Sequence, residues 1–186
     1  LILHQTLLIG TGILGAGQWR HQGYWQQVSP QQLVCGRILA FMLIYILFTS
    51  FYVGYCYHWY NVSIQASFGL VALWLLPFLL ATAAAGVAMS TLFTRRDLPT
   101  QVLLLISMPI LFVSGFVWPI ALIPEPLVLG SQIIPAVPAI MGMLELNQMG
   151  ATWASVLPKW LQLWGLFAAF FGLALLGIHR RARAWV

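Results

Sequence analysis

The amino-acid sequence predicts an all-α integral membrane protein that forms one transmembrane domain over residues 1–186. Hydrophobic residues make up 61% of the chain and charged residues 6%, whereas about a quarter of the residues in a soluble domain are charged. The mean hydropathy is +0.91. The uncharged runs are about 17 to 28 residues long, and a helix needs roughly 20 to cross the hydrocarbon core. These observations exclude a soluble domain and favour helices over barrel strands.

The apolar runs support five membrane spans. We expect them at residues 1–17, 38–57, 66–93, 99–118 and 161–178. Each span is free of Asp, Glu, Lys and Arg. Carriers that are driven by protons or ions usually hold an ionisable group within the membrane, so this absence argues against a self-powered carrier.

Basic residues divide the connectors between two sides. One side holds Arg20, Arg37, Arg95, Arg96, Arg180, Arg181 and Arg183, and the other holds Lys159 together with Glu125 and Glu145. Because cytoplasmic loops carry an excess of basic residues, we expect residues 18–37, 94–98 and 179–186 in the cytoplasm, the C-terminus included. Residues 58–65 and 119–160 are then expected to face outward.

The first and third spans contain groups of small residues. These are Gly10, Gly12, Gly15 and Gly17 in the first span, and Ala81, Ala84, Ala85, Gly86 and Ala88 in the third. Lipid supplies no hydrophobic drive for helix association, and small residues let helix backbones approach closely. We interpret both groups as packing faces within the chain, with a seam between two copies as the alternative.

The connector at 18–37 combines an aromatic segment with a helix-start signal. Ser29 is expected as the N-cap, Pro30 as the first helical residue and Gln32 as the third, which is a capping-box pattern. Before it lie Trp19, Arg20, His21, Gln22, Gly23, Tyr24, Trp25, Gln26 and Gln27. This composition is typical of an amphipathic segment in the membrane interface. The segment is either an interfacial anchor or a docking surface for a cytoplasmic partner.

The end of the fourth span is the most informative part of the sequence. It comprises Ser114, Gly115, Phe116, Val117, Trp118 and Pro119, followed by Pro124. The two small residues Ser114 and Gly115 and the nearby prolines are expected to end a membrane helix at the edge of the bilayer, where a gate or a binding site can form. The aromatic side chains of Phe112, Phe116 and Trp118 either line an amphipathic path or anchor the interface as an aromatic belt.

The outward segment 119–160 is too apolar for an ordinary loop. It has prolines at six positions, yet it also contains Leu127-Val128-Leu129 and Ile133-Ile134. No piece is long enough to cross the membrane, so we expect a pair of short helices that dip part-way into it, a re-entrant hairpin. Irregular backbone at this depth must be covered by protein or must line a water-filled cavity, which favours a functional site over a plain loop.

No catalytic residue and no metal ligand is predicted. Lys159 is the only lysine and no glycine-rich loop flanks it, so a phosphate-binding loop for ATP must belong to another polypeptide. The histidines His4, His21, His58 and His179 are scattered and are interpreted as interfacial. Cys35 and Cys56 are expected near opposite ends of one helix, too far apart to form a disulfide. The net charge of +5 comes from dispersed residues, which favours topology anchoring over nucleic-acid binding.

Several of these segments together carry a resemblance to a known family. Ser114-Gly115-Phe116 with Pro119 and Pro124 precedes Ile134-Pro135, Gly150-Ala151 and a last span that ends in Arg180-Arg181. The connector contains Gly23, Ser29-Pro30 and Gly36-Arg37. In order and topology the chain resembles the C-terminal membrane region, the last five of six spans, of type-2 ATP-binding-cassette (ABC) exporter permeases.

The resemblance implies partners and roles that the residues alone do not give. It implies that a first span, and often an extracytoplasmic domain, precedes residue 1. It also implies a homo- or heterodimer of permeases in membrane lipid, driven by cytoplasmic ABC ATPase subunits that bind ATP and Mg²⁺. The residues that the resemblance implies for coupling to the ATPase are Trp19, Arg20, Gly23, Tyr24, Trp25, Ser29 and Pro30. Those that it implies for the gate or hinge are Ser114, Gly115, Phe116, Pro119 and Pro124. The glutamines Gln22, Gln26 and Gln27 depart from the acidic residues that family members often carry there.

The expected function is therefore that of an exporter permease in a bacterial plasma membrane. It would move an amphipathic or hydrophobic substrate outward by alternating access, with drugs (as in multidrug efflux), lipids and lipid-linked glycans equally compatible with uncharged spans. Three alternatives stay open at this point: an ATP-independent channel or carrier, an intramembrane lipid-modifying enzyme, and a structural assembly subunit.

Overall fold

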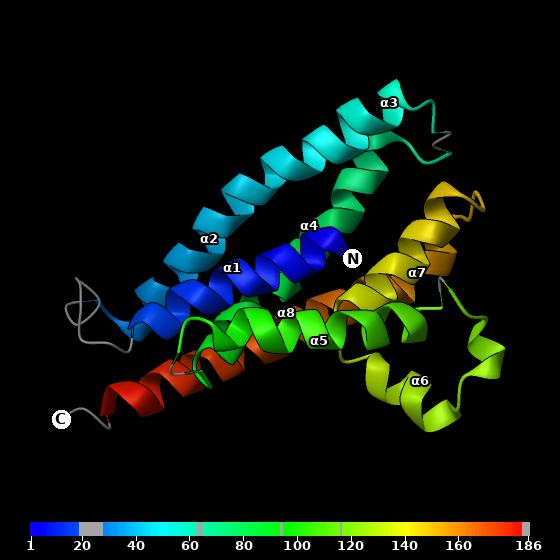
Figure 1. Ribbon diagram of the computed structural model, residues 1–186. Helices are drawn as coiled ribbons and strands as arrows, with labels where there is room; N and C mark the ends of the chain where they lie inside the picture. Colours follow the sequence, from blue (N-terminus) through cyan, green and yellow to red (C-terminus); the bar gives the residue numbers. More distant parts are fainter. Residues whose placement is uncertain (19–27, 63–64, 94, 116, 184–186) are drawn as a thin grey trace.

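The computed structural model describes residues 1–18, 28–62, 65–93, 95–115 and 117–183, and these residues form helices and connecting turns without a strand. The α-helices are α1 (Ile2–Gln18), α2 (Pro30–Thr49), α3 (Tyr57–Trp59), α4 (Phe68–Ser90), α5 (Leu98–Val113), α6 (Glu125–Ser131), α7 (Ala136–Asn147) and α8 (Trp153–Arg183). A π-helical stretch, η2 (Ser50–Cys56), joins α2 to α3, and a 3₁₀ turn, η3 (Ile120–Leu122), follows α5. The all-α prediction is confirmed for this part of the chain (Figure 1).

Three helices of the described chain are long and apolar enough to cross a membrane: Pro30–Trp59, Phe68–Ser90 and Trp153–Arg181. They correspond to the second, third and fifth predicted spans. The first and fourth correspond to shorter apolar helices, Ile2–Ala16 and Leu98–Val113. Helices α6 and α7 together would make a fourth candidate, but they are bent by 93° at their junction. The count of five spans and the re-entrant hairpin therefore stay predictions.

Three predicted boundaries differ from the structure. The helix that contains the second predicted span begins at Pro30, as the capping box predicts, and so extends beyond the predicted span at residue 38. The fourth ends at Val113 rather than at 118, because the chain turns at Gly115. The fifth begins at Trp153 rather than at 161, since the helix continues through a proline that removes one backbone donor near its start.

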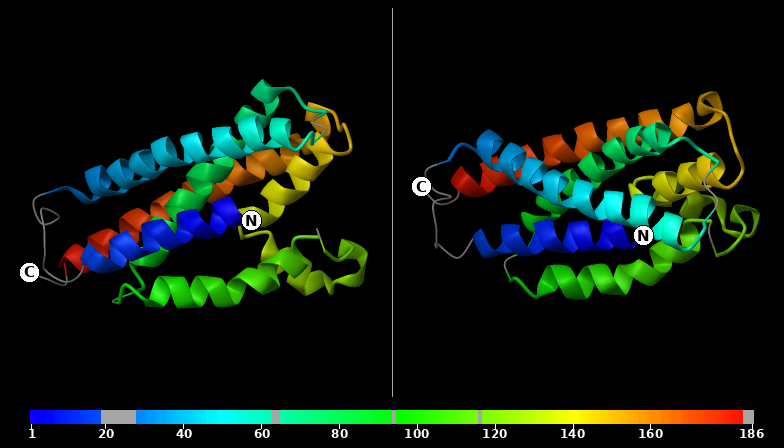
Figure 2. Two further views of the ribbon diagram at one scale, coloured as in Figure 1. Left: turned by 45° about the horizontal axis from the view of Figure 1, so that its top comes forward. Right: turned by 90° about the horizontal axis from the view of Figure 1, so that it is seen from above.

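Helix α4 lies at the centre of the bundle, and α1, α2, α7 and α8 pack against it. Helices α1, α4 and α8 run in the same direction, with α2 and α5 antiparallel to them (Figure 1). The end of α1, the start of α2, the connection from α4 to α5 and the C-terminus therefore lie at one end, as both views of Figure 2 show. We call it the arginine end, because Arg95, Arg96, Arg180 and Arg181 lie there. The opposite end, with residues 114–152, is the hairpin end.

The first and third predicted spans pack through their small residues. A Cβ at Gly86 of α4 would collide with the hydroxyl of Thr11 and lie 3.3 Å from the Cα of Leu8. One turn further, a Cβ at Gly15 of α1 would collide with Ser90. The backbones are thus as close as glycine allows, which confirms these groups as packing faces within the chain.

Arg37 does not lie in a connector, as its charge suggested. It is in the second turn of α2 and is 7% exposed. Its Nη1 would be 3.2 Å from a Cβ at Gly15 of α1. The small first helix leaves room for the long side chain beside it, so a charged residue is buried near the arginine end.

His4 also differs from its interpretation as an interfacial residue. It is 1% exposed, and its ring stacks on Phe78 of α4 with 6.3 Å between centroids. The free thiols of Cys35 and Cys56, by contrast, lie at separate ends of the continuous helix Pro30–Trp59, as predicted.

We expect Gly86→Leu to lower the free energy of unfolding by about 3 kcal/mol, because the new side chain must separate α1 from α4. Thermal melting of the purified protein in detergent measures the effect. Gly172→Leu on α8 is the matched control, since a Cβ there meets nothing within 4 Å. Equal melting temperatures for both variants would contradict the close packing of α1 and α4.

Candidate gate at the hairpin end

The predicted helix stop at Ser114 and Gly115 is confirmed. Helix α5 ends at Val113, and Ser114 is its C-cap. The buried Ser114 hydroxyl donates a hydrogen bond to the carbonyl of Leu111 at 2.7 Å. Gly115 has φ of +74°, a left-handed conformation that a residue with a Cβ adopts only at a cost. The chain therefore turns sharply here because it contains glycine.

The turn at Gly115 packs on two other elements. A Cβ at Gly115 would be 2.7 Å from Cγ1 of Ile120 in η3 and 3.0 Å from the sulfur of Met141 in α7. The end of α5 is thus brought against α7, which the linear sequence does not reveal. Phe116 lies outside the described residues.

The two predicted gate prolines shape the backbone. Pro119 is the N-cap of η3 and Pro124 is the N-cap of α6. Both side chains are exposed. Their fixed φ and extended ψ start each short helix and direct the chain outward from the bundle. Phe112 and Trp118 contact each other edge to face at 6.5 Å and are about half exposed, so within this chain they face outward.

Helices α6 and α7 have different environments. Helix α6 projects from the bundle (Figure 1), and its Leu127 and Leu129 are 56% and 65% exposed. Helix α7 is buried along one face and packs on α4 and α8. The short apolar helices predicted for this segment exist, but only the second of them is part of the helical core.

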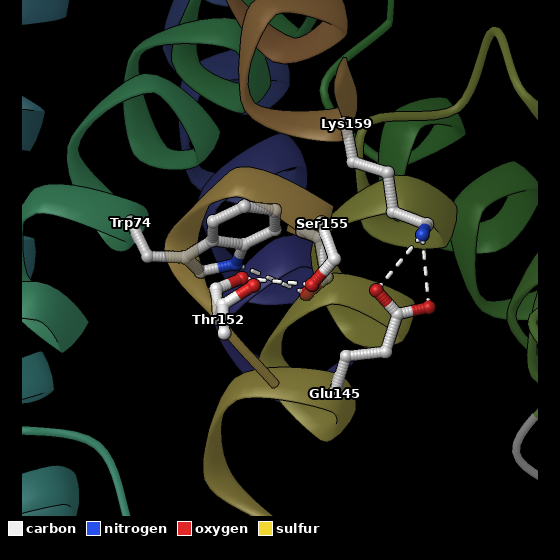
Figure 3. Close-up of polar contacts among 6 residues, drawn as sticks. Trp74, Glu145, Thr152, Ser155 and Lys159 are labelled. Atoms are coloured by element: carbon white, nitrogen blue, oxygen red, sulfur yellow. Dashed lines mark hydrogen bonds and ion pairs between the residues drawn. The ribbon is translucent and has the colours of Figure 1, made fainter. Parts of the chain in front are cut away.

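An ion pair joins α7 to α8. Lys159 Nζ lies 2.8 Å and 2.9 Å from the two carboxylate oxygens of Glu145, and both side chains are partly buried (Figure 3). Beyond it along α8, the amide of Gln162 donates to the carbonyl and the side-chain oxygen of Gln132, at 3.0 Å and 3.2 Å. We call these two pairs the α8 clamp. The clamp was not predicted from the sequence, although Lys159 is the one lysine and Glu145 is a nearby glutamate on the same predicted side.

Trp74 fixes the other face of α7. Its indole N–H donates to the carbonyl of Ala139 at 3.2 Å (Figure 3), and its ring occupies the space where Gly142 would carry a Cβ. Trp160 of α8 donates to the carbonyl of Leu73 at 3.0 Å. At the start of α8, the hydroxyl of Ser155 donates to the carbonyl of Thr152 at 2.7 Å. Direct hydrogen bonds therefore connect α4, α7 and α8 at the hairpin end.

The loops at the hairpin end are tied together as well. Gly150 has φ of +60°, and the amide of Gln65 donates to the carbonyl of Gln148 at 3.3 Å. The backbone N–H of Gln65 donates to the carbonyl of Asn147 at 3.3 Å. The connection that enters α4 thus contacts the connection that leaves α7.

The predicted coupling region is only partly described. Trp19, Arg20, Gly23, Tyr24 and Trp25 lie outside the described residues. The capping box that follows them is confirmed: the Ser29 hydroxyl accepts from the N–H of Gln32 at 3.3 Å, and the Gln32 side chain accepts from the N–H of Ser29 at 3.2 Å. Pro30 is the first residue of α2.

Exposed charges also lie at the arginine end. Arg95 and Asp97 form an exposed ion pair at 2.8 Å in the connection between α4 and α5. Across the described chain, no group of three His, Cys, Asp or Glu residues could hold a metal ion.

Comparison with known proteins identifies a family that the chain matches. A family model described as ABC-2 family transporter protein matches residues 3–176, nearly the whole chain. The comparisons with curated proteins and with solved structures gave no significant match. The matched region includes the connector between α1 and α2, the glycine turn after α5 and the hairpin end. The chain belongs to the ABC-2 family of transporter proteins, as a membrane permease subunit.

Proposed function

We propose that this permease exports an amphipathic or hydrophobic substrate by alternating access, driven by ATP that separate ATPase subunits bind with Mg²⁺. Family membership supports the role of the chain as the membrane subunit of an ABC exporter. The only lysine, Lys159 of α8, pairs with Glu145 of α7 and is not part of a phosphate-binding loop, which supports the assignment of ATP hydrolysis to a partner.

The observation that carries this proposal is the unequal attachment of α5 and α7. A hydrogen bond from Trp74 and the Glu145–Lys159 ion pair hold α7 to α4 and α8, and Gln162 of α8 also bonds Gln132 at the end of α6. Helix α5 packs mainly on α1 and reaches the hairpin end through the glycine turn at Gly115. A helix that is joined to a fixed body by one glycine turn can tilt about that turn. Gly115 is thus the hinge, and the α8 clamp keeps the outward hairpin in place while α5 moves.

The connector between α1 and α2 is assigned as the place where the motion of the ATPase subunits is transmitted to the permease. The capping box gives α2 a defined first turn, so a force on the connector reaches the long helix Pro30–Trp59 without fraying its start. Helix α2 packs on α4, and α4 contacts α1 and α8. Closure of the ATPase subunits can therefore reach the core of the bundle through α2.

The arginine end is assigned to the cytoplasm and the hairpin end to the outside. The arginines on the connector from α4 to α5 and at the end of α8 support this orientation. A second permease subunit completes the transporter in the lipid of a bacterial plasma membrane. Since the candidate spans are apolar on their exposed faces, drugs, lipids and lipid-linked glycans are the proposed substrate classes.

Replacement of residues 19–27 by a Gly/Ser linker of equal length is expected to reduce ATP turnover by the reconstituted exporter at least tenfold relative to the unaltered complex. The physical reason is loss of the surface that receives the motion of the ATPase. A Gly/Ser replacement of residues 61–66, at the hairpin end, is the control. Unchanged turnover after the first replacement, with complex formation intact on gel filtration, would rule out coupling through this connector.

Gly115→Ala tests the hinge. A left-handed residue with a Cβ is strained, and the added carbon would press on Ile120, so the free energy of unfolding is expected to fall by about 1–2 kcal/mol. ATP turnover of the reconstituted exporter is expected to fall as well, because the turn becomes stiffer. Gly130→Ala, where a Cβ meets nothing within 4 Å, should change neither quantity. If the variant is less stable but its ATP turnover is normal, Gly115 has a structural role only and the hinge proposal is wrong.

The ion pair of the α8 clamp is tested by a double-mutant cycle of Glu145→Gln and Lys159→Met. Because the pair is partly buried and has good geometry, we expect a coupling energy of about 1 kcal/mol. Chemical denaturation in mixed micelles gives the four free energies. The same cycle on the exposed pair Arg95 and Asp97 is the control and should give a smaller value. Equal coupling energies would mean that the clamp contributes no more than a surface pair.

A further inference from the structure

A proline interrupts the backbone hydrogen bonds of α4 near the middle of the helix. Pro77 lies inside α4 (Phe68–Ser90) and is buried. Because proline has no backbone N–H, the carbonyl of Leu73, four residues earlier, has no backbone donor within the helix. Inside a membrane no water is present to satisfy such a carbonyl, so a neighbouring group has to do so. The structure supplies a side chain from another helix.

The indole of Trp160 on α8 takes the place of the missing donor. Its Nε1–H donates to the carbonyl of Leu73 at 3.0 Å. The ring is partly exposed and contacts Trp153 and Trp164 edge to face, at 5.7 Å and 5.8 Å between centroids. A backbone donor is withdrawn only when the helix unwinds, whereas an indole is withdrawn by a change of rotamer. This bond can therefore open while α4 stays helical.

Pro77 also separates two parts of α4 that have different neighbours. Before it, Trp74 bonds the backbone of α7, and beyond it, Gly86 packs closely on α1. Helix α8 contacts both parts of α4, through Trp160 on the first and through Gly177, where a Cβ would collide with the C-cap residue, at the end of the second. Helices bend most readily at a proline, and here α8 holds the two parts in one alignment.

We propose that Pro77 and Trp160 form a lock on a joint in the middle of α4, which we call the α4 lock. While the indole bonds the carbonyl of Leu73, the two parts of α4 stay aligned, and α4, α7 and α8 behave as one body. When the indole turns away, the part of α4 before Pro77 is free to bend relative to the part that packs on α1. The α4 lock is separate from the turn at Gly115, and it does not depend on how the exporter is driven.

The distance between two spin labels on either side of the proline tests the proposal. The labels are attached at Phe68→Cys and Leu92→Cys, which are exposed positions about 36 Å apart at 1.5 Å per residue. The two free cysteines are first replaced, as Cys35→Ser and Cys56→Ser. Double electron–electron resonance on the full chain in phosphatidylcholine nanodiscs is expected to give one narrow distance distribution.

Three variants separate the α4 lock from simple packing. Trp160→Phe keeps an aromatic ring but removes the N–H, and it is expected to broaden the distribution about twofold. Pro77→Ala restores the backbone donor to Leu73, so Trp160→Phe should leave the distribution narrow in that background. Trp164→Phe is the matched control, because the indole N–H of Trp164 has no hydrogen-bond partner among the described residues. It should leave the width unchanged.

A narrow distribution for Trp160→Phe alone, or equal broadening with and without Pro77→Ala, would overturn the proposal. Equal broadening by Trp160→Phe and Trp164→Phe would also overturn it, since the effect would then come from ring packing rather than from the hydrogen bond. If Trp160→Phe alone does not fold on gel filtration, recovery of folding by Pro77→Ala supports the α4 lock. Failure of both the single and the double variant to fold would count against it.

Discussion

The close approach of α1 to α4 is the constraint on which the rest of the structure depends. Inside a membrane, apolar surface gains little from leaving lipid for protein, so helix association needs backbones that fit closely. Gly86 and Gly15 remove the side chains that would separate the two helices. Helix α4 is therefore the central helix of the bundle, and contacts with it position α2, α7 and α8. The buried Arg37 follows from the same fit, since it occupies space left beside a glycine.

Polar interactions act on top of this packing and divide the hairpin end into two parts. Trp74 and Lys159 join α7 to α4 and α8, and Gln162 joins α8 to Gln132 at the end of α6. Each of these directed bonds would be costly to leave unmade in an apolar setting. Among the described residues, no side-chain hydrogen bond joins α5 to α7, and α5 reaches α7 through the turn at Gly115. Helix α7 is the fixed part, and α5 is the part joined by a glycine turn. A permease needs both kinds of part if it is to open and close without losing its fold.

Local signals in the sequence were informative where a few adjacent residues decide the structure. The capping box at Ser29 and Gln32 and the stop at Ser114 and Gly115 both occur as predicted, because each depends on hydrogen bonds or dihedral angles within one turn. Predicted helix lengths were less accurate. Hydropathy marks an apolar run but does not show that α8 continues back through a proline to Trp153, since contacts with α7 and α4 stabilise that part.

The sequence by itself determined the all-α membrane class, the gathering of arginines at one end and the resemblance to ABC exporter permeases, because composition, charge and motif order are linear properties. Only the tertiary structure decided which residues meet. Glu145 and Lys159 are 14 positions apart and Trp74 and Ala139 are 65 apart, so no periodicity relates them. The burial of His4 and Arg37 is likewise a product of helix packing, in which each side chain's surroundings come from other elements.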